Sequence, residues 1–292
     1  MEEKHAYLIM AHANPRQLSL LLKLIDDPRN DIYLHIDKGS SSDFKLHFSP
    51  SLAYSQLHII PSISIHWGGW SQIECEIKLL EAAASSATTY SYYHLLSGMD
   101  LPIKNQDTIH DFFHKHSGKE FLACWFTEEN NTFTNDLYER LRFYYPLQDL
   151  TPRLDTISPR ISKLLQRMLH INRIRDKTFK LAKGANWFSI TSSFAEYVLG
   201  HQQFIRKYFR SSLCGDEIFM QTLLVNSPYR ESLWQDVHNQ NLRCIDWERG
   251  KPYTFRADDF MMLTQSKAMF ARKFDERLDN TIIEMVQEHV GE

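Results

Sequence analysis

The stretch HAYLIMAHANPRQLSLLLKLIDDPRNDIYLHID, residues 5 to 37, decides the fold. It predicts a buried strand from His5 to His12 and a second strand from Asp31 to Asp37. Between them, Pro15 to Ile25 has the pattern of a helix, with Asn14 as its cap. A helix between two apolar strands is typical of a parallel β-α-β unit. The stretch therefore predicts an α/β protein whose strands end together at one edge of a sheet.

The alternation of strands and helices continues along the chain. Further strands are expected at Gln56–Ile60, Tyr92–Gly98, Glu120–Phe126, Trp187–Thr191 and Leu242–Asp246. Helices are expected at Ser71–Ala84 and Asp107–His116, and from Ser193, Asp216 and about Glu276. This order predicts an α/β fold with a mostly parallel central sheet and helices on both faces. Because no linker or repeat interrupts the pattern, we expect a single domain over residues 1–292.

The composition is that of an ordinary folded chain of 292 residues, 43% of them hydrophobic. Since 33 Lys and Arg face 36 Asp and Glu, the formal net charge is −3, and no nucleic acid partner is expected. The sequence shows neither a signal peptide nor a membrane-spanning run. Its isolated cysteines are expected to be reduced, and together these features predict a cytoplasmic protein; they are Cys75, Cys124, Cys214 and Cys244.

Residues 151–183 form a strongly basic segment, in which nine Lys or Arg face two Asp. The segment is expected to be a helical insertion, made partly amphipathic by Leu164, Leu165, Met168, Leu169 and Ile171. One interpretation is a solvated helix over the edge of the sheet. Another is that residues 153–183 contact an anionic glycan, a lipid-linked acceptor or, peripherally, the anionic inner face of a membrane.

Several motifs that would define other chemistries are absent from the sequence. It has no glycine-rich phosphate loop, no His-Glu-x-x-His and no Gly-x-Ser-x-Gly. It also lacks Asp-x-Asp, the pair with which nucleotide-sugar enzymes usually hold a metal. His110 and His114 are one helical turn apart and could hold a transition metal, but a solvated helix face is the favoured interpretation.

Four segments contain residues that folding alone does not require and that suit the binding of a ligand. Asp37 ends an apolar strand, which places it at the sheet edge where ligands bind. Trp67 and Gly68 precede a helix and would let the backbone approach a flat ligand, although a structural turn has the same pattern. Asp100 follows a buried strand on a turn that a proline stiffens. Late in the chain, adjacent bases at residues 272–273 are suited to phosphate, but an exposed strand would alternate them and face only one inward.

Seven segments in order carry a resemblance to a known family: His35–Lys38, Trp67–Gly69, Leu96–Ile103, Asn186–Phe188, Asp216–Ser227, Asp246–Trp247 and Phe270–Phe274. The chain resembles the core-2/I-branching β-1,6-N-acetylglucosaminyltransferases and peptide O-xylosyltransferases, glycosyltransferase family 14, and most of all their soluble bacterial members. The resemblance covers about Tyr7 to Asp275. It implies a GT-A-type nucleotide-sugar glycosyltransferase fold and an inverting, metal-independent transfer from a UDP-sugar. The sugar would be GlcNAc or, next, xylose, and the acceptor a hydroxyl of a glycan, a lipid-linked molecule or a peptide.

The resemblance also implies roles for the residues that match its motifs. Glu217 would be the general base, although the same residue could simply favour a helix N-terminus. The leaving diphosphate would be neutralised by Arg272 and Lys273, with Arg249 and Lys251 as candidates in a stretch where the family varies.

Other matched residues would bind the donor. Asp37 would meet the uracil or ribose and Asp100 the nucleotide-sugar, while Trp187 would line the donor or acceptor pocket. Trp67 and Gly68 belong to the same expected donor site, and no cofactor is expected beyond the UDP-sugar itself. The alternative is a non-catalytic module that uses the same fold to bind a nucleotide or a glycan.

Overall fold

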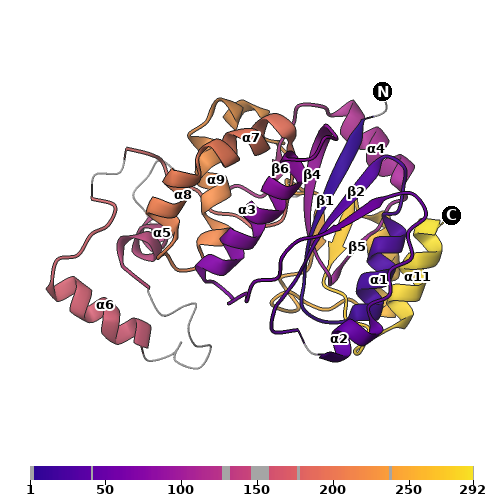
Figure 1. The fold of residues 1–292 in the computed structure, drawn as a ribbon. Helices are drawn as coiled ribbons and strands as arrows, with labels where there is room; N and C mark the ends of the chain where they lie inside the picture. The colour runs from indigo at the N-terminus through magenta and orange to yellow at the C-terminus, as the bar shows by residue number, and fades with distance from the viewer. Residues whose placement is uncertain are drawn as a thin grey trace.

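The computed structural model describes residues 3–40, 42–126, 132–145, 158–175, 178–236 and 239–291. Its centre is a six-stranded sheet of order β3-β2-β1-β4-β7-β6 (Figure 1). The strands are β1 (Lys4–Ala11), β2 (Asn30–Ile36), β3 (Gln56–Ile59), β4 (Tyr90–Ser97), β6 (Phe121–Leu122) and β7 (Phe188–Thr191). β1 to β4 pair in parallel, whereas β7 runs antiparallel to both of its neighbours.

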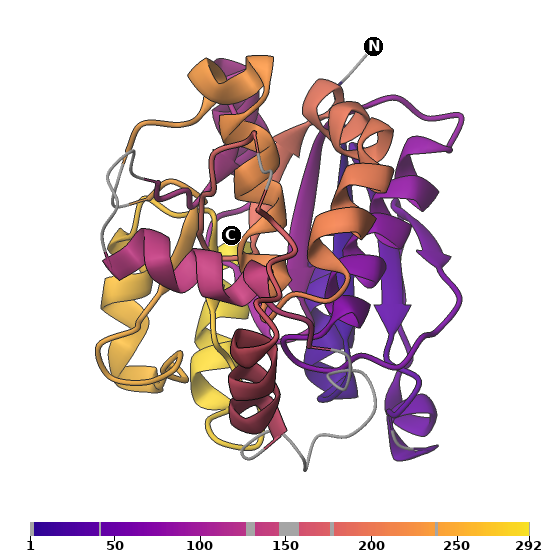
Figure 2. The same ribbon diagram turned by 90° about the vertical axis from the view of Figure 1, so that its left-hand side faces the viewer.

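Helices cover both faces of this sheet, because its central strand is apolar on both sides. In β1, Ala6 and Leu8 join one buried cluster, and Tyr7 and Ile9 join another on the opposite face. The first face carries α3 (Trp70–Ala84), α7 (Ser192–Gly200), α8 (Gln202–Phe209) and α9 (Phe219–Val225). The second carries α1 (Pro15–Leu24), α4 (Gln106–Lys115) and α11 (Thr281–Gly291) (Figures 1 and 2). The predicted α/β architecture is confirmed, and it is the one expected of a GT-A-type fold.

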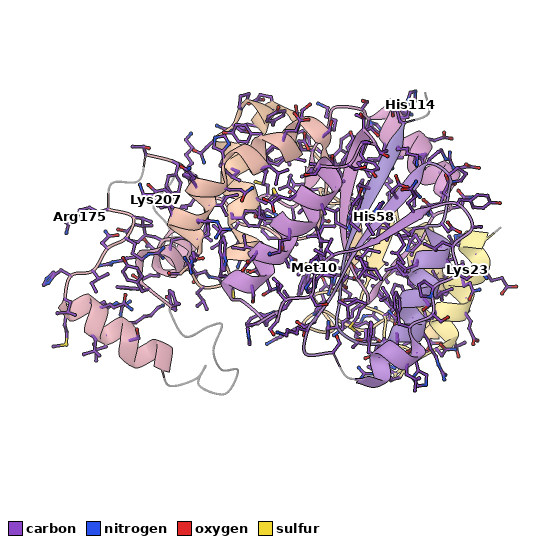
Figure 3. All side chains as sticks on the ribbon, viewed as in Figure 1. Met10, Lys23, His58, His114, Arg175 and Lys207 are labelled. Atoms are coloured by element: carbon purple, nitrogen blue, oxygen red, sulfur yellow. The ribbon has the colours of Figure 1, made fainter. Side chains whose placement is uncertain are left out.

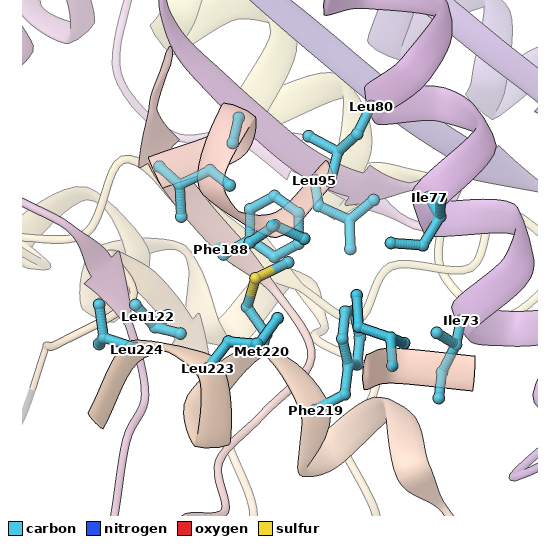
Figure 4. Close-up of a cluster of buried hydrophobic side chains, with 14 of the residues drawn as sticks. Ile73, Ile77, Leu80, Leu95, Leu122, Phe188, Phe219, Met220, Leu223 and Leu224 are labelled. Carbon is cyan, nitrogen blue, oxygen red and sulfur yellow. The ribbon is translucent and has the colours of Figure 1, made fainter. Parts of the chain in front are cut away.

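The buried cluster on the first face fixes the position of a short turn that precedes α9. Figure 4 shows Ile73 and Ile77 of α3 pointing toward the side chains of α9, with Phe219 next to Ile73. A 3-10 turn, η1 (Gly215–Glu217), precedes α9, so the predicted helix from Asp216 begins as a 3-10 turn instead. A Cβ atom on Gly215 would lie 3.0 Å from the Ile73 side chain, so this turn packs closely on α3.

A second, three-stranded sheet was not predicted. It has the order β5-β9-β8, with β5 (Asp100–Pro102), β9 (Phe270–Arg272) and β8 (Arg243–Ile245). β5 and β9 are antiparallel and pair Asp100 with Arg272, and β8 is parallel to β9. The pairing brings together two residues that are far apart in the sequence.

Several predicted boundaries are corrected by local hydrogen bonds. The last helix begins at Thr281 and not near Glu276, since Asp279 Oδ1 accepts the N–H of Ile282 (3.2 Å) and starts the helix there. Asn14 precedes α1 but does not cap it with its side chain, which donates to Asp275 Oδ1 (3.0 Å) instead. The strand expected over Glu120–Phe126 is only the two residues of β6.

Of the histidine pair on α4, His114 faces solvent as expected, whereas His110 does not. His110 is 7% exposed, shares a 2.9 Å hydrogen bond with Asn30 Oδ1 and stacks on His5 at 4.0 Å. Burial lowers the pKa of His110 to about 4. His114 is exposed, and the described residues contain no group of three or more His, Cys, Asp or Glu arranged to hold a metal.

The remaining helices are α2 (Ser42–His47), α5 (Thr132–Arg142), α6 (Ser158–Met168) and α10 (Phe260–Gln265), with 3-10 turns η2 (Pro228–Ser232) and η3 (Ala257–Asp259). Figure 1 shows α6, from the basic segment, away from the sheet, so the interpretation as a helix over the sheet edge is wrong. Residues 151–157 and 176–177 of that segment lie outside the described residues. The four cysteines are free, and in the described ranges no helix is long and apolar enough to cross a membrane.

Candidate functional site

Asp37 lies at the end of β2 and organises the adjoining loops. Its Oδ1 accepts the N–H of Gly39 (2.6 Å) and its Oδ2 accepts the N–H of Ile65 (2.6 Å). Its own N–H donates to the Ala11 carbonyl at the end of β1 (2.8 Å). The carboxylate therefore holds the loop after β3 against the carboxyl ends of β1 and β2, where parallel sheets bind ligands.

Asp100 and Arg272 form a buried pair at the start of the second sheet. Asp100 is 1% exposed, accepts the N–H and the hydroxyl of Ser97 (2.8 and 3.0 Å), and lies 3.1 Å from Arg272 Nη1. The Arg272 guanidinium lies over the Trp187 ring, 4.0 Å from its centroid. Burial lowers the pKa of Arg272, and the Asp100 charge opposes that shift. Within the described ranges, Nε and Nη2 of Arg272 have no hydrogen-bond partner, so part of the guanidinium is open to an anion.

Lys273 extends this positive charge to the ends of β1 and β2. His12, which follows β1, has its pKa lowered by desolvation, while Asp37 opposes the shift. Lys273, Arg277 and Arg272 lower the pKa of His12 further by charge repulsion. These effects indicate that the ends of β1, β2 and β9 lie close together. Arg272 and Arg277 are paired with Asp100 and Asp275, whereas no ion pair joins Lys273 to a carboxylate among the described residues.

Glu217, at the end of η1, belongs to a second charged cluster. Its Oε2 accepts a hydrogen bond from Arg140 Nη1 (3.2 Å) and lies 3.5 Å from Lys183 Nζ. Its backbone carbonyl accepts the N–H of Gly184 (2.9 Å). Oε1 has no hydrogen bond to any described residue, so two cations position the carboxylate and leave one oxygen free to accept a proton.

The loop from Ile65 to Gly68 joins the two clusters. Ile65 is bound by Asp37, and the Gly68 carbonyl accepts the N–H of Cys214, three residues before Glu217 (2.9 Å). Gly68 has φ 72°, and a Cβ there would lie 3.0 Å from Cys214 Sγ, so both conformation and space favour glycine. Trp67, between them, is 81% exposed. Its ring is therefore not part of the core and is free to contact a ligand.

Two buried acids lie behind Glu217. Glu76 of α3 is fully buried and Asp216 is 6% exposed, and among the described residues Oε1 and Oε2 of Glu76 and Oδ1 of Asp216 have no hydrogen-bond partner. Burial raises the pKa of Glu76 well above its usual range, and the Asp216 carboxyl adds to the shift. Burial, followed by the charge of Glu217, raises the pKa of Asp216 to about 7. Because an unpaired charge is costly inside a protein, burial favours the neutral form of Glu76.

Arg249 and Lys251 stand apart from these clusters. Arg249 Nε lies 2.5 Å from Asp246 Oδ2, its Nη1 lies 2.7 Å from Asp259 Oδ1, and its guanidinium stacks on Tyr253. Lys251 is exposed. No contact within the described part of the chain joins either base to Arg272, and the charge of Arg249 is already matched by two carboxylates.

A cavity of about 840 Å³ opens beside the strand edge, next to His12. It is bounded by the start of α1, by α2 and by α11, and polar side chains such as Arg16, Arg277 and Glu284 line much of it. Gly39, which donates to Asp37, connects this cavity to the candidate site. None of the site residues predicted from the sequence lines it.

Sequence reasoning missed the residues that hold the predicted ones in place. Arg140 lies in α5, a helix that was not predicted, and Lys183 was counted only as one charge of the basic segment. Ser97 was quoted in the segment around Asp100 without a role, and Glu76 follows the ordinary pattern of an amphipathic helix. No local signal in the sequence distinguishes these side chains from solvated ones.

A family model and several curated proteins each match most of this chain. The family model described as Core-2/I-Branching enzyme matches residues 5–267. Xylosyltransferase 2 of Rattus norvegicus is 25% identical over 307 residues, a match covering 98% of this chain and 33% of the rat protein. Xylosyltransferase sqv-6 of Caenorhabditis briggsae is 24% identical, with 94% of this chain and 35% of that protein covered. The chain thus spans about a third of the length of these curated relatives.

Among solved structures, the apo form of mouse xyloside xylosyltransferase 1 matches with a TM-score of 0.39 and 11% identity. That match covers 92% of this chain and 96% of the mouse chain.

Proposed function

Because the chain belongs to the Core-2/I-Branching enzyme family, we propose that it is an inverting glycosyltransferase that moves a sugar from a UDP-sugar to an acceptor hydroxyl. One arrangement carries this proposal. A cationic sheet edge around Arg272 and a positioned carboxylate at Glu217 are joined through the loop that holds Trp67. The first suits a diphosphate, the second suits an acceptor hydroxyl, and inverting transfer needs both.

In the proposed reaction the acceptor oxygen attacks the anomeric carbon from the face opposite UDP. The new bond joins that carbon to the acceptor oxygen, and the bond from the carbon to the diphosphate oxygen breaks. The acceptor proton goes to Oε1 of Glu217, while Arg140 and Lys183 keep the carboxylate in place through Oε2.

The leaving UDP gains negative charge, so fixed cations at the sheet edge would stabilise the transition state. Arg272 is pre-oriented by Asp100 and Trp187, and its free nitrogens can face a phosphate oxygen. With Lys273 beside it, the two side chains can do the work of a metal ion, and a donor of this type is worth roughly 3 kcal/mol in a transition state. Asp37 and Asp100 would contact the nucleoside and sugar, and Trp67 would cover them.

The identity of the sugar is a separate question. The family resemblance favoured UDP-GlcNAc over UDP-xylose as the donor. The curated relatives named above are xylosyltransferases, which supports UDP-xylose as the first donor to test. The acceptor would be a glycan, a lipid-linked molecule or a peptide. Because all four cysteines are free, the cytoplasm is the proposed compartment.

The first experiment is calorimetry with UDP, UDP-xylose and UDP-GlcNAc, with EDTA present throughout. We expect saturable UDP binding that Lys273→Ala weakens and that Lys267→Ala, at an exposed base just before β9, leaves unchanged. Transfer is then followed by UDP release in the presence of candidate acceptors. Binding that returns only with Mn²⁺ or Mg²⁺ would contradict the metal-independent mechanism, and tight binding without turnover of any donor would favour a binding module.

A further inference from the structure

Helix α6 and Leu169, the residue that follows it, expose large apolar side chains on one side. Leu164, Leu165, Met168 and Leu169 are 60, 53, 68 and 72% exposed, and their spacing puts them on adjacent turns of the same side. The other side of the helix is occupied: Gln166 is buried and exchanges hydrogen bonds with the backbone of Tyr144. The apolar side chains therefore project outward because the polar ones hold the helix to the protein.

The segment that carries this apolar face is rich in basic residues. The described stretch 158–175 contains no Asp or Glu, and its bases are Arg160, Lys163, Arg167, Arg173 and Arg175. Glu139 of α5 pairs with Lys163 and Arg167 (4.0 and 2.7 Å), whereas Arg175 is exposed. Exposed Lys207 of α8 lies nearby, since Arg173 Nη2 donates to its carbonyl (3.2 Å). Figure 3 shows Arg175 and Lys207 at the same end of the molecule as α6.

We propose that this end of the molecule docks on the surface of an anionic lipid bilayer, with the apolar face of α6 in the interface. An exposed row of leucines and methionine flanked by bases is the composition of an interfacial helix. A site for nucleic acid would combine basic side chains with aromatic rings on which nucleobases stack, whereas the exposed side chains of this face are leucines and methionine. A protein ligand helix would need a groove, whereas α6 presents the convex side of a single helix.

Docking by α6 would place the candidate base on the membrane side of the protein. Arg167 of α6 contacts Glu139 of α5, and the next residue of α5, Arg140, contacts Glu217. Helix α5 therefore contacts both α6 and Glu217. If the proposed transfer is correct, a lipid-linked acceptor would reach Glu217 from the bilayer surface.

The test is co-sedimentation of the full chain with vesicles of equal parts phosphatidylcholine and phosphatidylglycerol, compared with phosphatidylcholine alone. We expect binding to the anionic vesicles, weakened by added salt, and a loss of roughly tenfold or more in the variant Leu164→Gln/Leu165→Gln/Met168→Gln/Leu169→Gln. Arg175→Glu should weaken binding by a smaller factor. These side chains are exposed, so far-ultraviolet circular dichroism should show an unchanged fold.

A matched variant carries glutamines at three equally exposed apolar positions elsewhere, Leu46, Met261 and Leu278. It should bind vesicles like the unmodified protein. Equal binding by the α6 variant, or no vesicle binding by the unmodified protein, would overturn the proposal. A dimer in size-exclusion chromatography that the α6 variant dissolves, without vesicle binding, would show that the face holds a second copy instead. Since the assay uses no sugar donor, its outcome is independent of the proposed transfer.

Discussion

Asp216→Asn should stabilise the protein, and by an amount that depends on pH. Asp216 is 6% exposed, and burial followed by the Glu217 charge raises its pKa from 3.8 to about 7. The unfolded chain loses this proton near pH 3.8, but the folded protein keeps it to about pH 7. Below pH 3.8, Asp216 therefore does not lower the free energy of unfolding. Between the two pKa values it lowers that free energy increasingly, and above about pH 7 the loss is complete.

The size of the effect follows from that interval. Each pH unit corresponds to about 1.4 kcal/mol, so the full penalty is about 4 kcal/mol. Asn cannot ionise, and the variant should gain little at about pH 4 and up to about 4 kcal/mol above pH 7. The assay is urea denaturation of both proteins at a series of pH values, with the difference in unfolding free energy plotted against pH. Burial also lowers the pKa of His5, His94 and His110, but both proteins share these residues, so their contribution cancels in the difference.

Asp275→Asn is the matched control because its expected sign is opposite. The hydrogen bond from the Arg277 side chain is the main reason that the pKa of Asp275 falls to about 2. Asp275 thus contributes stability above pH 3.8 that is lost as pH falls toward 2, and Asn there should cost about 1 to 2 kcal/mol at neutral pH, since exposed Arg277 is partly screened. A difference for Asp216→Asn that does not change with pH, or a loss of stability above pH 7, would refute the reasoning about the buried acid.

The remaining predictions concern the candidate site. Glu217→Gln should keep UDP affinity but lower transfer by about 100-fold or more, as followed by UDP release; near-normal turnover would remove Glu217 as the base. Arg272→Lys should weaken UDP binding by about tenfold in calorimetry, because Lys keeps the charge but loses the stacked, forked geometry over Trp187; unchanged affinity would mean that charge alone matters. Gly68→Ala should lower the free energy of unfolding by about 1 to 2 kcal/mol in urea, given its φ of 72°, and an unaltered midpoint would show that the loop relaxes freely. Arg249→Ala should weaken UDP binding less than Lys273→Ala does, since two carboxylates already hold Arg249; an equal loss would return Arg249 to the donor site.

The large sheet could be predicted because its central strands bury both faces and leave a long apolar signal. The boundaries of β1 and β2 differ from the prediction by one residue. The second sheet could not be predicted as a sheet. Its strand β8 was expected within Leu242–Asp246, but β5 and β9 have three residues each, too few to show a period of two. The direction of β7 could not be predicted for a different reason: apolar residues alternate in the same way in parallel and antiparallel strands.

For the site, family motifs gave the candidate residues but not their electrostatic partners. Apart from the family motif, Arg249 and Arg272 look alike in the sequence, because each is a base near aromatic residues. In the structure, Arg249 is enclosed by Asp246 and Asp259, whereas Arg272 has one carboxylate and free nitrogens. Partner carboxylates are contributed by distant strands or loops, so their effect depends on pairing that the sequence does not display.

The adjacent acids Asp216 and Glu217 show why neighbours in sequence can have opposite chemistry. η1 is a tight turn packed on α3, and it directs Asp216 toward buried Glu76 and Glu217 toward Arg140 and Lys183. The first acid loses hydration, and backbone hydrogen bonds and the charge of Arg140 offset this loss only in part, so its neutral form is favoured. The second gains two cations and keeps an open oxygen. A carboxylate that must accept a proton during a reaction has to be charged beforehand, and of the two acids only Glu217 forms ion pairs with cations among the described residues. The choice of base therefore follows from the direction of one turn.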